Sequence, residues 1–94
     1  MIRYAPVALH DVRRLHGWLV ERDAARAAGK LMRRLADAER RIAERPNGWP
    51  LTQSGLARRY LMRLGRSTYV VHYVVDGDDQ VIVRIWHGRE DRPL

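Results

Sequence analysis

The sequence predicts an α+β fold in which a helical hairpin packs on one face of a twisted antiparallel sheet, with elements in the order β-α-α-β-β-β. Two observations carry this prediction. Before Pro46 apolar residues recur every three or four positions, which is typical of helices, and after Pro46 a period of two takes over, which is typical of strands. The chain of 94 residues is enough for one core, so residues 1–94 are expected to form a single domain.

The first part of the chain predicts a short strand followed by a helix. Residues 1–5, "MIRYA", are expected to add an edge strand to the sheet. A helix over residues 7–21 is predicted by four apolar residues at spacings of four, three and four: Ala8, Val12, Leu15 and Leu19. Asp11 and Arg14 are expected to point away from this face, whereas Trp18 is expected to complete it.

A longer apolar stripe predicts a second helix over residues 23–45. Its members are Ala24, Ala28, Leu31, Leu35, Ala38 and Ile42. Asp23 offers a side-chain oxygen as an N-cap for this helix. Pro46 cannot continue the helix, and Asn47–Gly48 follow as turn residues. Because the connection between the two helices is short, we expect an antiparallel helical hairpin.

Three strands joined by tight turns are predicted after the helices, at residues 57–64, 67–75 and 80–87. In the first strand Tyr60, Met62 and Leu64 share one face. Gly65–Arg66 and the segment "DGDD" at residues 76–79 are expected to form the two turns. The last two strands are apolar on both faces, so we expect them in the middle of the sheet.

Composition limits the class of protein. Eighteen basic residues, all arginine except Lys30, face eleven acidic ones and give a net charge of +7. This charge is consistent with a polyanionic or acidic partner, or with a solvated basic surface. The absence of cysteine excludes disulfides and thiolate chemistry. No apolar run approaches the ~18 residues of a membrane span, and the start lacks a secretory signal, so a cytoplasmic location is expected.

Taken in order, these segments resemble the RelE/ParE superfamily of type II toxin–antitoxin toxins. Residues 4–51 resemble the family's strand, helical hairpin and proline–glycine break, and residues 58–75, "RRYLMRLGRSTYVVHYVV", resemble its arginine-bearing hairpin. Residues 81–91, "VIVRIWHGRED", are similar to its terminal strand with a His-Gly-Arg signature. The "HGRED" close is similar to the ParE branch in particular.

The resemblance implies two different activities. The ParE branch implies inhibition of DNA gyrase, without an enzymatic reaction, by a toxin that an antitoxin neutralises. The RelE branch implies cleavage of mRNA in the ribosomal A site. A third alternative is a superfamily member that has lost toxicity and only binds its antitoxin.

A cationic target-binding surface is expected on the strands and their ends. Its members are Arg58, Arg59, Arg63, Arg66, Arg84, His87 and Arg89. Cleavage of RNA also needs groups that transfer protons, and arginine effectively cannot lose its proton. The predicted sheet carries no lysine and no tyrosine follows Tyr73, so His87 is the sole catalytic candidate.

Three interpretations of His87 stay open: a general acid or base, part of a partner-contacting surface, or a strand-end histidine held by a backbone hydrogen bond. On an alternating strand Arg84 and Trp86 share one face, whereas Ile85 and His87 share the other. This separation weakens a shared site of Arg84 and His87.

Two tryptophans are candidates for antitoxin contact. Trp49 lies in the loop between Pro46 and Pro50, and Trp86 lies near the end of the last strand. The alternative for Trp49 is that it caps the end of the helical hairpin, and the alternative for Trp86 is that it lies inside the core. An amphipathic antitoxin segment is expected to dock in a groove or add a strand, and an acidic one would complement the charge of +7. No metal-ligand motif is present, and no cofactor is expected.

Overall fold

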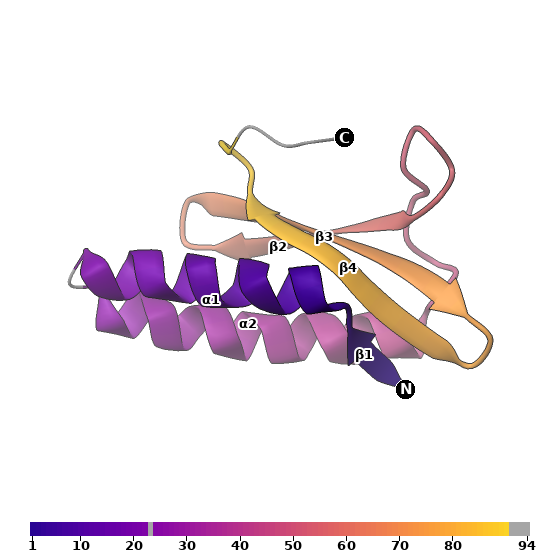
Figure 1. Cartoon of the computed structure of the whole chain (residues 1–94), viewed down its shortest axis with the longest axis horizontal. Helices are drawn as coiled ribbons and strands as arrows, with labels where there is room; N and C mark the ends of the chain where they lie inside the picture. The colour runs from indigo at the N-terminus through magenta and orange to yellow at the C-terminus, as the bar shows by residue number, and fades with distance from the viewer. Residues whose placement is uncertain (23, 91–94) are drawn as a thin grey trace.

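In the computed structural model, which describes residues 1–22 and 24–90, two helices cover one face of a four-stranded sheet (Figure 1). The elements are β1 (Ile2–Tyr4), α1 (Pro6–Glu21), α2 (Ala25–Glu44), β2 (Arg58–Leu64), β3 (Ser67–Asp76) and β4 (Asp79–His87). The predicted fold class and element order are therefore confirmed. The proposed N-cap, Asp23, lies outside the described residues.

The strand order is β1-β4-β3-β2, so β3 and β4 occupy the middle of the sheet as predicted. The prediction of a wholly antiparallel sheet was wrong in one respect, because β1 pairs with β4 in parallel. A parallel pair needs a long crossover connection. Here the helical hairpin and the β2–β3 hairpin lie between β1 and β4 in the chain and supply it.

Both predicted tight turns are present. Leu64 pairs with Ser67 across the β2–β3 turn, and Asp76 pairs with Asp79 across the β3–β4 turn. The first residue of each two-residue loop is a glycine with φ of +60°, at Gly65 and Gly77. A positive φ at this position gives the loop a twist that matches the flanking strands.

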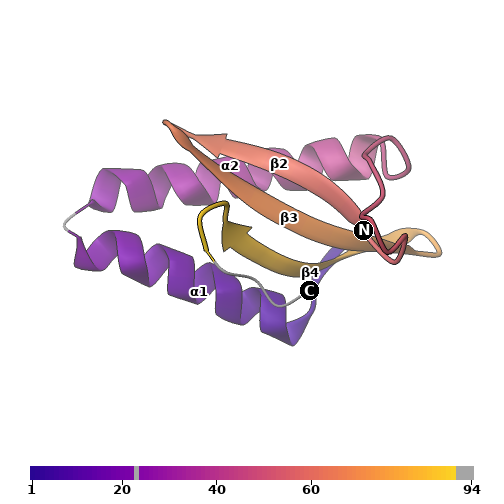
Figure 2. The ribbon, with the colours of Figure 1, turned by 90° about the horizontal axis from the view of Figure 1, so that it is seen from above.

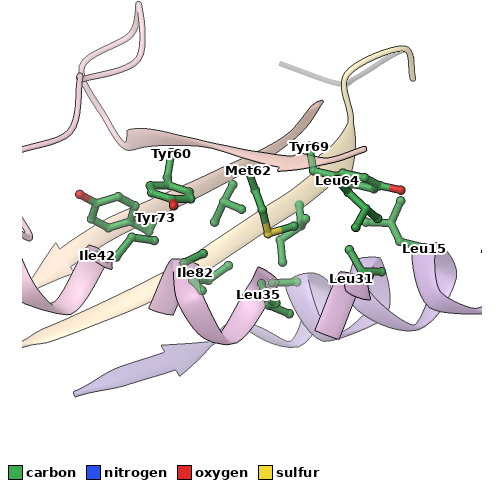
Figure 3. Close-up of a cluster of buried hydrophobic side chains, with 14 of the residues drawn as sticks. Leu15, Leu31, Leu35, Ile42, Tyr60, Met62, Leu64, Tyr69, Tyr73 and Ile82 are labelled. Carbon is green, nitrogen blue, oxygen red and sulfur yellow. The ribbon is translucent and has the colours of Figure 1, made fainter. Parts of the chain in front are cut away.

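A single apolar layer fills the space between helices and sheet (Figure 3). α1 packs along β4, and α2 packs along β2 (Figure 2). The predicted helical stripes supply Ala8, Leu15, Leu19, Ala28, Leu31, Leu35, Ala38 and Ile42, and the strands supply Tyr60, Met62, Leu64, Tyr69, Val71, Tyr73, Ile82 and Ile85. The prediction that Trp18 completes this layer was wrong, because the residue is 48% exposed.

A β-bulge in β4 changes which residues face the core. Tyr73 pairs with Ile82 but His72 pairs with Arg84, so Val83 is an extra residue on β4. Ile82 and Ile85 are three positions apart, yet both are buried in the core. The bulge therefore also sets which backbone groups of β4 point to the edge of the sheet.

Neither helix in the described part of the chain has the length and apolar composition needed to cross a membrane.

The alternating faces of β2 give a direct test of this packing. Met62 is 2% exposed under the helices, whereas its neighbour Leu61 is 55% exposed on the opposite face. We expect Met62→Ala to lower the free energy of unfolding by about 2–4 kcal/mol through the cavity it leaves. Leu61→Ala is the matched control and should cost less than about 1 kcal/mol in the same urea titration. Equal losses would contradict the assignment of the two faces.

Candidate functional site

Beyond β1, the outer edge of β4 is completed by α1 rather than by another strand. β1 ends at Tyr4, and the Ala5 N–H donates the last backbone bond of this edge to the Ile82 carbonyl at 2.9 Å. Further along, the Ile85 N–H donates to the Asp11 carboxylate at 2.8 Å, and Arg14 donates to the Ile85 carbonyl at 3.4 Å. Side chains of α1 therefore take the place of a neighbouring strand.

Asp11 is buried, which corrects the prediction that it points away from the core. Asp11 is only 3% exposed. Its carboxylate also accepts hydrogen bonds from Arg84 Nε at 2.9 Å, from Arg84 Nη2 at 3.3 Å and from Arg14 Nη2 at 3.2 Å. A buried charge is tolerated when it is paired and hydrogen-bonded in this way. Asp11 lies at helical spacing from Ala8 and Leu15, so an acidic residue within the apolar stripe was the signal that sequence analysis missed.

The environment of Asp11 favours its charged form. Burial on its own would raise the pKa of the carboxyl group. The bonds from Arg84, from the Ile85 N–H and from Arg14 outweigh this effect, and the pKa of Asp11 is lowered from its ordinary value. The Arg84 guanidinium is correspondingly held in its protonated form, because the same ion pair raises its pKa.

The HGRE turn, defined as His87–Glu90, is attached to the same network. The Glu90 carboxylate accepts a bond from the His87 N–H at 2.7 Å and forms an ion pair with Arg14. On the other side, the Gly88 N–H donates to the Thr68 carbonyl at 2.8 Å. A Cβ at position 88 would lie 2.9 Å from that oxygen, so this close approach requires glycine. The glycine of the His-Gly-Arg signature thus has a structural role.

The His87 ring is held by two contacts. Its Nδ1 accepts a hydrogen bond from the Arg89 N–H at 3.1 Å, so this nitrogen is engaged within the turn. Its ring meets Tyr69 edge-on, with centroids 5.1 Å apart. Burial, and then the Glu90 carboxylate, raise the pKa of the Tyr69 phenol, which stays protonated at neutral pH. The remaining ring nitrogen, Nε2, is the position of His87 from which proton transfer is chemically feasible.

A pocket lies between α1, the β2–β3 turn and the HGRE turn. It has a volume of about 880 Å³, and α1 contributes Arg14, Leu15 and Trp18 to its walls. The other lining residues come from the strand ends: Arg66, Ser67, Thr68, Tyr69, His87, Gly88, Arg89 and Glu90. This volume lies within the range of ligand-binding pockets in proteins.

The structure divides the predicted cationic surface into separate groups. Arg66, His87 and Arg89 meet in the pocket. Arg59 and Arg84 lie in one cross-strand row through His72, on the face of the sheet that the helices leave uncovered.

Two members of that surface lie outside both groups. Arg63 is on the same uncovered face as Arg59, but it is exposed opposite Thr68 in a different cross-strand row. Arg58 is half-buried at the start of β2, where it donates to the Trp49 carbonyl at 2.7 Å. Arg84 and His87 face opposite ways, as strand alternation predicted, and Arg84 is paired with Asp11 rather than with His87.

The two tryptophans predicted to contact an antitoxin both pack on their own chain. The half-buried Trp49 donates to the Arg41 carbonyl at 3.5 Å and meets Tyr60 edge-on at 4.8 Å. Trp86 is 6% exposed and meets His72 edge-on at 4.5 Å on the uncovered face. Their contact with an antitoxin stays a prediction. Within residues 1–22 and 24–90, no group of three or more His, Asp or Glu side chains is placed to hold a metal ion.

Comparisons with known proteins agree on the RelE/ParE superfamily of toxins. The family model described as "ParE toxin of type II toxin-antitoxin system, parDE" matches residues 2–92. A curated relative, "Toxin RelE1" of Caulobacter vibrioides, is 38% identical over 85 residues, covering 90% of this chain and 89% of the relative. A solved structure, "Chromosomal ParDE TA system from P. aeruginosa", aligns with a TM-score of 0.73 at 17% identity over 92% of each chain, which supports the fold.

Removing the charge of Asp11 should destabilise the protein in a pH-dependent way. At pH 7 we expect Asp11→Asn to lower the free energy of unfolding by about 3 kcal/mol, since Arg84 loses its buried partner. Because the folded-state pKa of Asp11 is lowered, its stabilisation is present above the ordinary value of 3.8 and is lost as the pH falls through the folded-state pKa.

Urea unfolding of the wild type and of Asp11→Asn from pH 7 to pH 2.5 measures the difference in their free energies of unfolding. This difference should become smaller toward pH 2.5. Asp37→Asn is the matched control, because Asp37 forms a partly exposed pair with Arg40. Its cost should stay below about 0.5 kcal/mol. A wild-type advantage over Asp11→Asn that does not change with pH would contradict the ionic role of Asp11.

A second substitution tests the close approach of the HGRE turn to β3. Gly88→Ala should lower the free energy of unfolding by about 1–3 kcal/mol, because the new methyl group meets the Thr68 carbonyl. Gly17→Ala is the matched control, since a Cβ there has nothing within 4 Å and the site is helical. It should raise stability by up to about 1 kcal/mol. Thermal unfolding of both variants checks these opposite signs, and a neutral Gly88→Ala would refute the contact.

Proposed function

The chain belongs to the ParE toxin family of type II toxin–antitoxin systems, and we propose that it stops growth by binding DNA gyrase. In this proposal it acts without chemistry of its own, as one functional domain over residues 1–94. A cognate antitoxin neutralises it, and both act in the cytoplasm, where gyrase and its DNA are found. The proposal rests on family membership together with the chemistry of the pocket.

The observation that favours binding over cleavage is the shortage of proton-transfer groups around the pocket cations. Arg66 and Arg89 supply positive charge, but arginine remains protonated and is a poor acid or base. The raised pKa of Tyr69 keeps its phenol neutral, and the Glu90 carboxylate is bonded to Arg14 and to the His87 N–H. Such a pocket is suited to holding an anionic group.

The alternative function is ribosome-dependent cleavage of mRNA, as the resemblance to the RelE branch implies. One relative carries the name "Toxin RelE1", and Nε2 of His87 lies in a pocket with Arg66 and Arg89. That combination would supply one proton-transfer group and two cations for a phosphate. Among the described lining residues there is no second histidine and no lysine to share the proton transfer, which is why we favour gyrase binding.

A gyrase assay tests the proposal directly. Supercoiling and DNA cleavage by purified gyrase are measured with and without micromolar toxin, and we expect less supercoiling and more cleaved DNA. The His87→Ala variant should inhibit gyrase at a concentration within about threefold of that needed for the wild type. If His87 were instead a catalytic acid or base, its loss would lower activity by at least about 100-fold. No effect of the wild-type toxin on gyrase would reject the proposed target.

The same two proteins distinguish the alternatives. Primer extension on ribosome-bound mRNA would reveal new A-site ends if the toxin cleaves RNA, and those ends would disappear with His87→Ala. A superfamily member that only binds its antitoxin would give neither result, and its expression alone would not slow growth. The antitoxin is identified as the product of a neighbouring gene that restores growth to cells expressing the toxin.

A further inference from the structure

We propose that the pocket between α1, the β2–β3 turn and the HGRE turn binds an acidic peptide segment of the antitoxin. In this proposal the segment inserts an apolar side chain between Leu15, Trp18 and Tyr69 and presents carboxylates to Arg66 and Arg89. The inference rests on the proposed neutralisation by an antitoxin and assigns it a surface. It also differs from the predicted contacts at Trp49 and Trp86.

The apolar part of the pocket is suited to a single anchoring side chain. Leu15 and Tyr69 are buried core residues whose surfaces reach the pocket, at 6% and 2% exposure. Trp18 stands beside them with its side chain exposed and carries the Arg22 guanidinium 4.2 Å from its ring centroid. An apolar side chain of the partner that covers this tryptophan would remove exposed apolar surface from water.

The arginines around the pocket differ in whether they are paired within the described chain. Arg14 is already paired with Asp11 and Glu90. By contrast, no hydrogen bond or ion pair joins the guanidinium of Arg66 or Arg89 to any residue within 1–22 and 24–90. Two exposed guanidinium groups beside an apolar pocket match the carboxylates of an acidic amphipathic segment, because each can bind a carboxylate through two parallel bonds. The net charge of +7 favours encounter with such a segment.

The same features are less suited to nucleic acid. A single strand is usually held by a groove that follows successive phosphates and by open aromatic faces on which bases stack. Here the two guanidinium groups without a partner in the described chain, Arg66 and Arg89, line a single pocket and do not follow an extended groove. The ring of the exposed Trp18 is covered on one face by the Arg22 guanidinium. Tyr69 is buried and meets His87 edge-on, so its ring is not a stacking platform.

Charge reversal in the full-length toxin tests the inference. The double variant Arg66→Glu with Arg89→Glu is compared with Arg33→Glu plus Arg41→Glu, which changes the net charge equally at exposed positions of α2 outside the pocket. Binding of the fluorescently labelled antitoxin is measured by anisotropy at physiological salt. We expect about 100-fold weaker binding for the pocket variant and less than about threefold for the control. Trp18→Ala should weaken binding about tenfold.

The outcomes separate this inference from the proposed function. If the wild type binds the antitoxin but both double variants weaken binding equally, the effect is general charge and the pocket assignment is overturned. If the wild type does not bind the antitoxin, the proposed neutralisation itself fails, and the inference fails with it. Circular dichroism and thermal unfolding of each variant confirm that the fold is retained.

A second probe tests the nucleic-acid alternative. A short fluorescein-labelled single-stranded oligonucleotide replaces the antitoxin in the same titrations. We expect the two double variants to bind it equally, since only the total charge should matter for a polyanion that does not use the pocket. Selective loss of oligonucleotide binding in the pocket variant, with antitoxin binding unchanged, would overturn the inference in favour of a nucleic-acid site.

Discussion

The arrangement of the functional end of this toxin depends on one buried carboxylate. Asp11 binds the backbone of Ile85 and the side chain of Arg84 on β4, and Arg14 extends the network to Glu90. β1 is only three residues long, so the edge of β4 beyond it would otherwise present unpaired backbone groups. Because these contacts span the junction of helix, sheet edge and terminal turn, they fix the HGRE turn against α1 and thereby form one wall of the pocket.

Much of the fold follows from the spacing of apolar residues along the sequence. The helical stripes from Ala8 to Ile42 and the alternation of β2 are the residues that form the core. Three features did not follow from pattern. The parallel pairing of β1 depends on where the chain returns after about seventy-five residues, which local spacing does not encode. The bulge at Val83 places Ile82 and Ile85 on one side, although strict alternation separates them. Asp11 looks like a surface residue until Arg84 and the Ile85 N–H are brought to it.

The sequence predicts which residue types form the candidate site, but it does not predict how they are arranged. The arginines and His87 can be identified from the sequence, and strand alternation correctly separates Arg84 from His87. The sequence alone does not distinguish a cation held in an internal ion pair from one whose guanidinium forms no hydrogen bond or ion pair with the described residues. Arg84 belongs to the first kind, whereas Arg66 and Arg89 belong to the second. This distinction depends on tertiary contacts, and it moves the functional interpretation from the uncovered sheet face to the pocket beside α1.

The central claim is that α1 completes the edge of β4 through Asp11, and amide hydrogen exchange of Ile85 measures this most directly. The Ile85 N–H faces the edge beyond β1, where no strand of residues 1–22 and 24–90 pairs with it. The account predicts that it exchanges as slowly as the amides of the central β3–β4 ladder, because Asp11 accepts its hydrogen bond. Exchange at the rate of a solvent-exposed edge amide would contradict it.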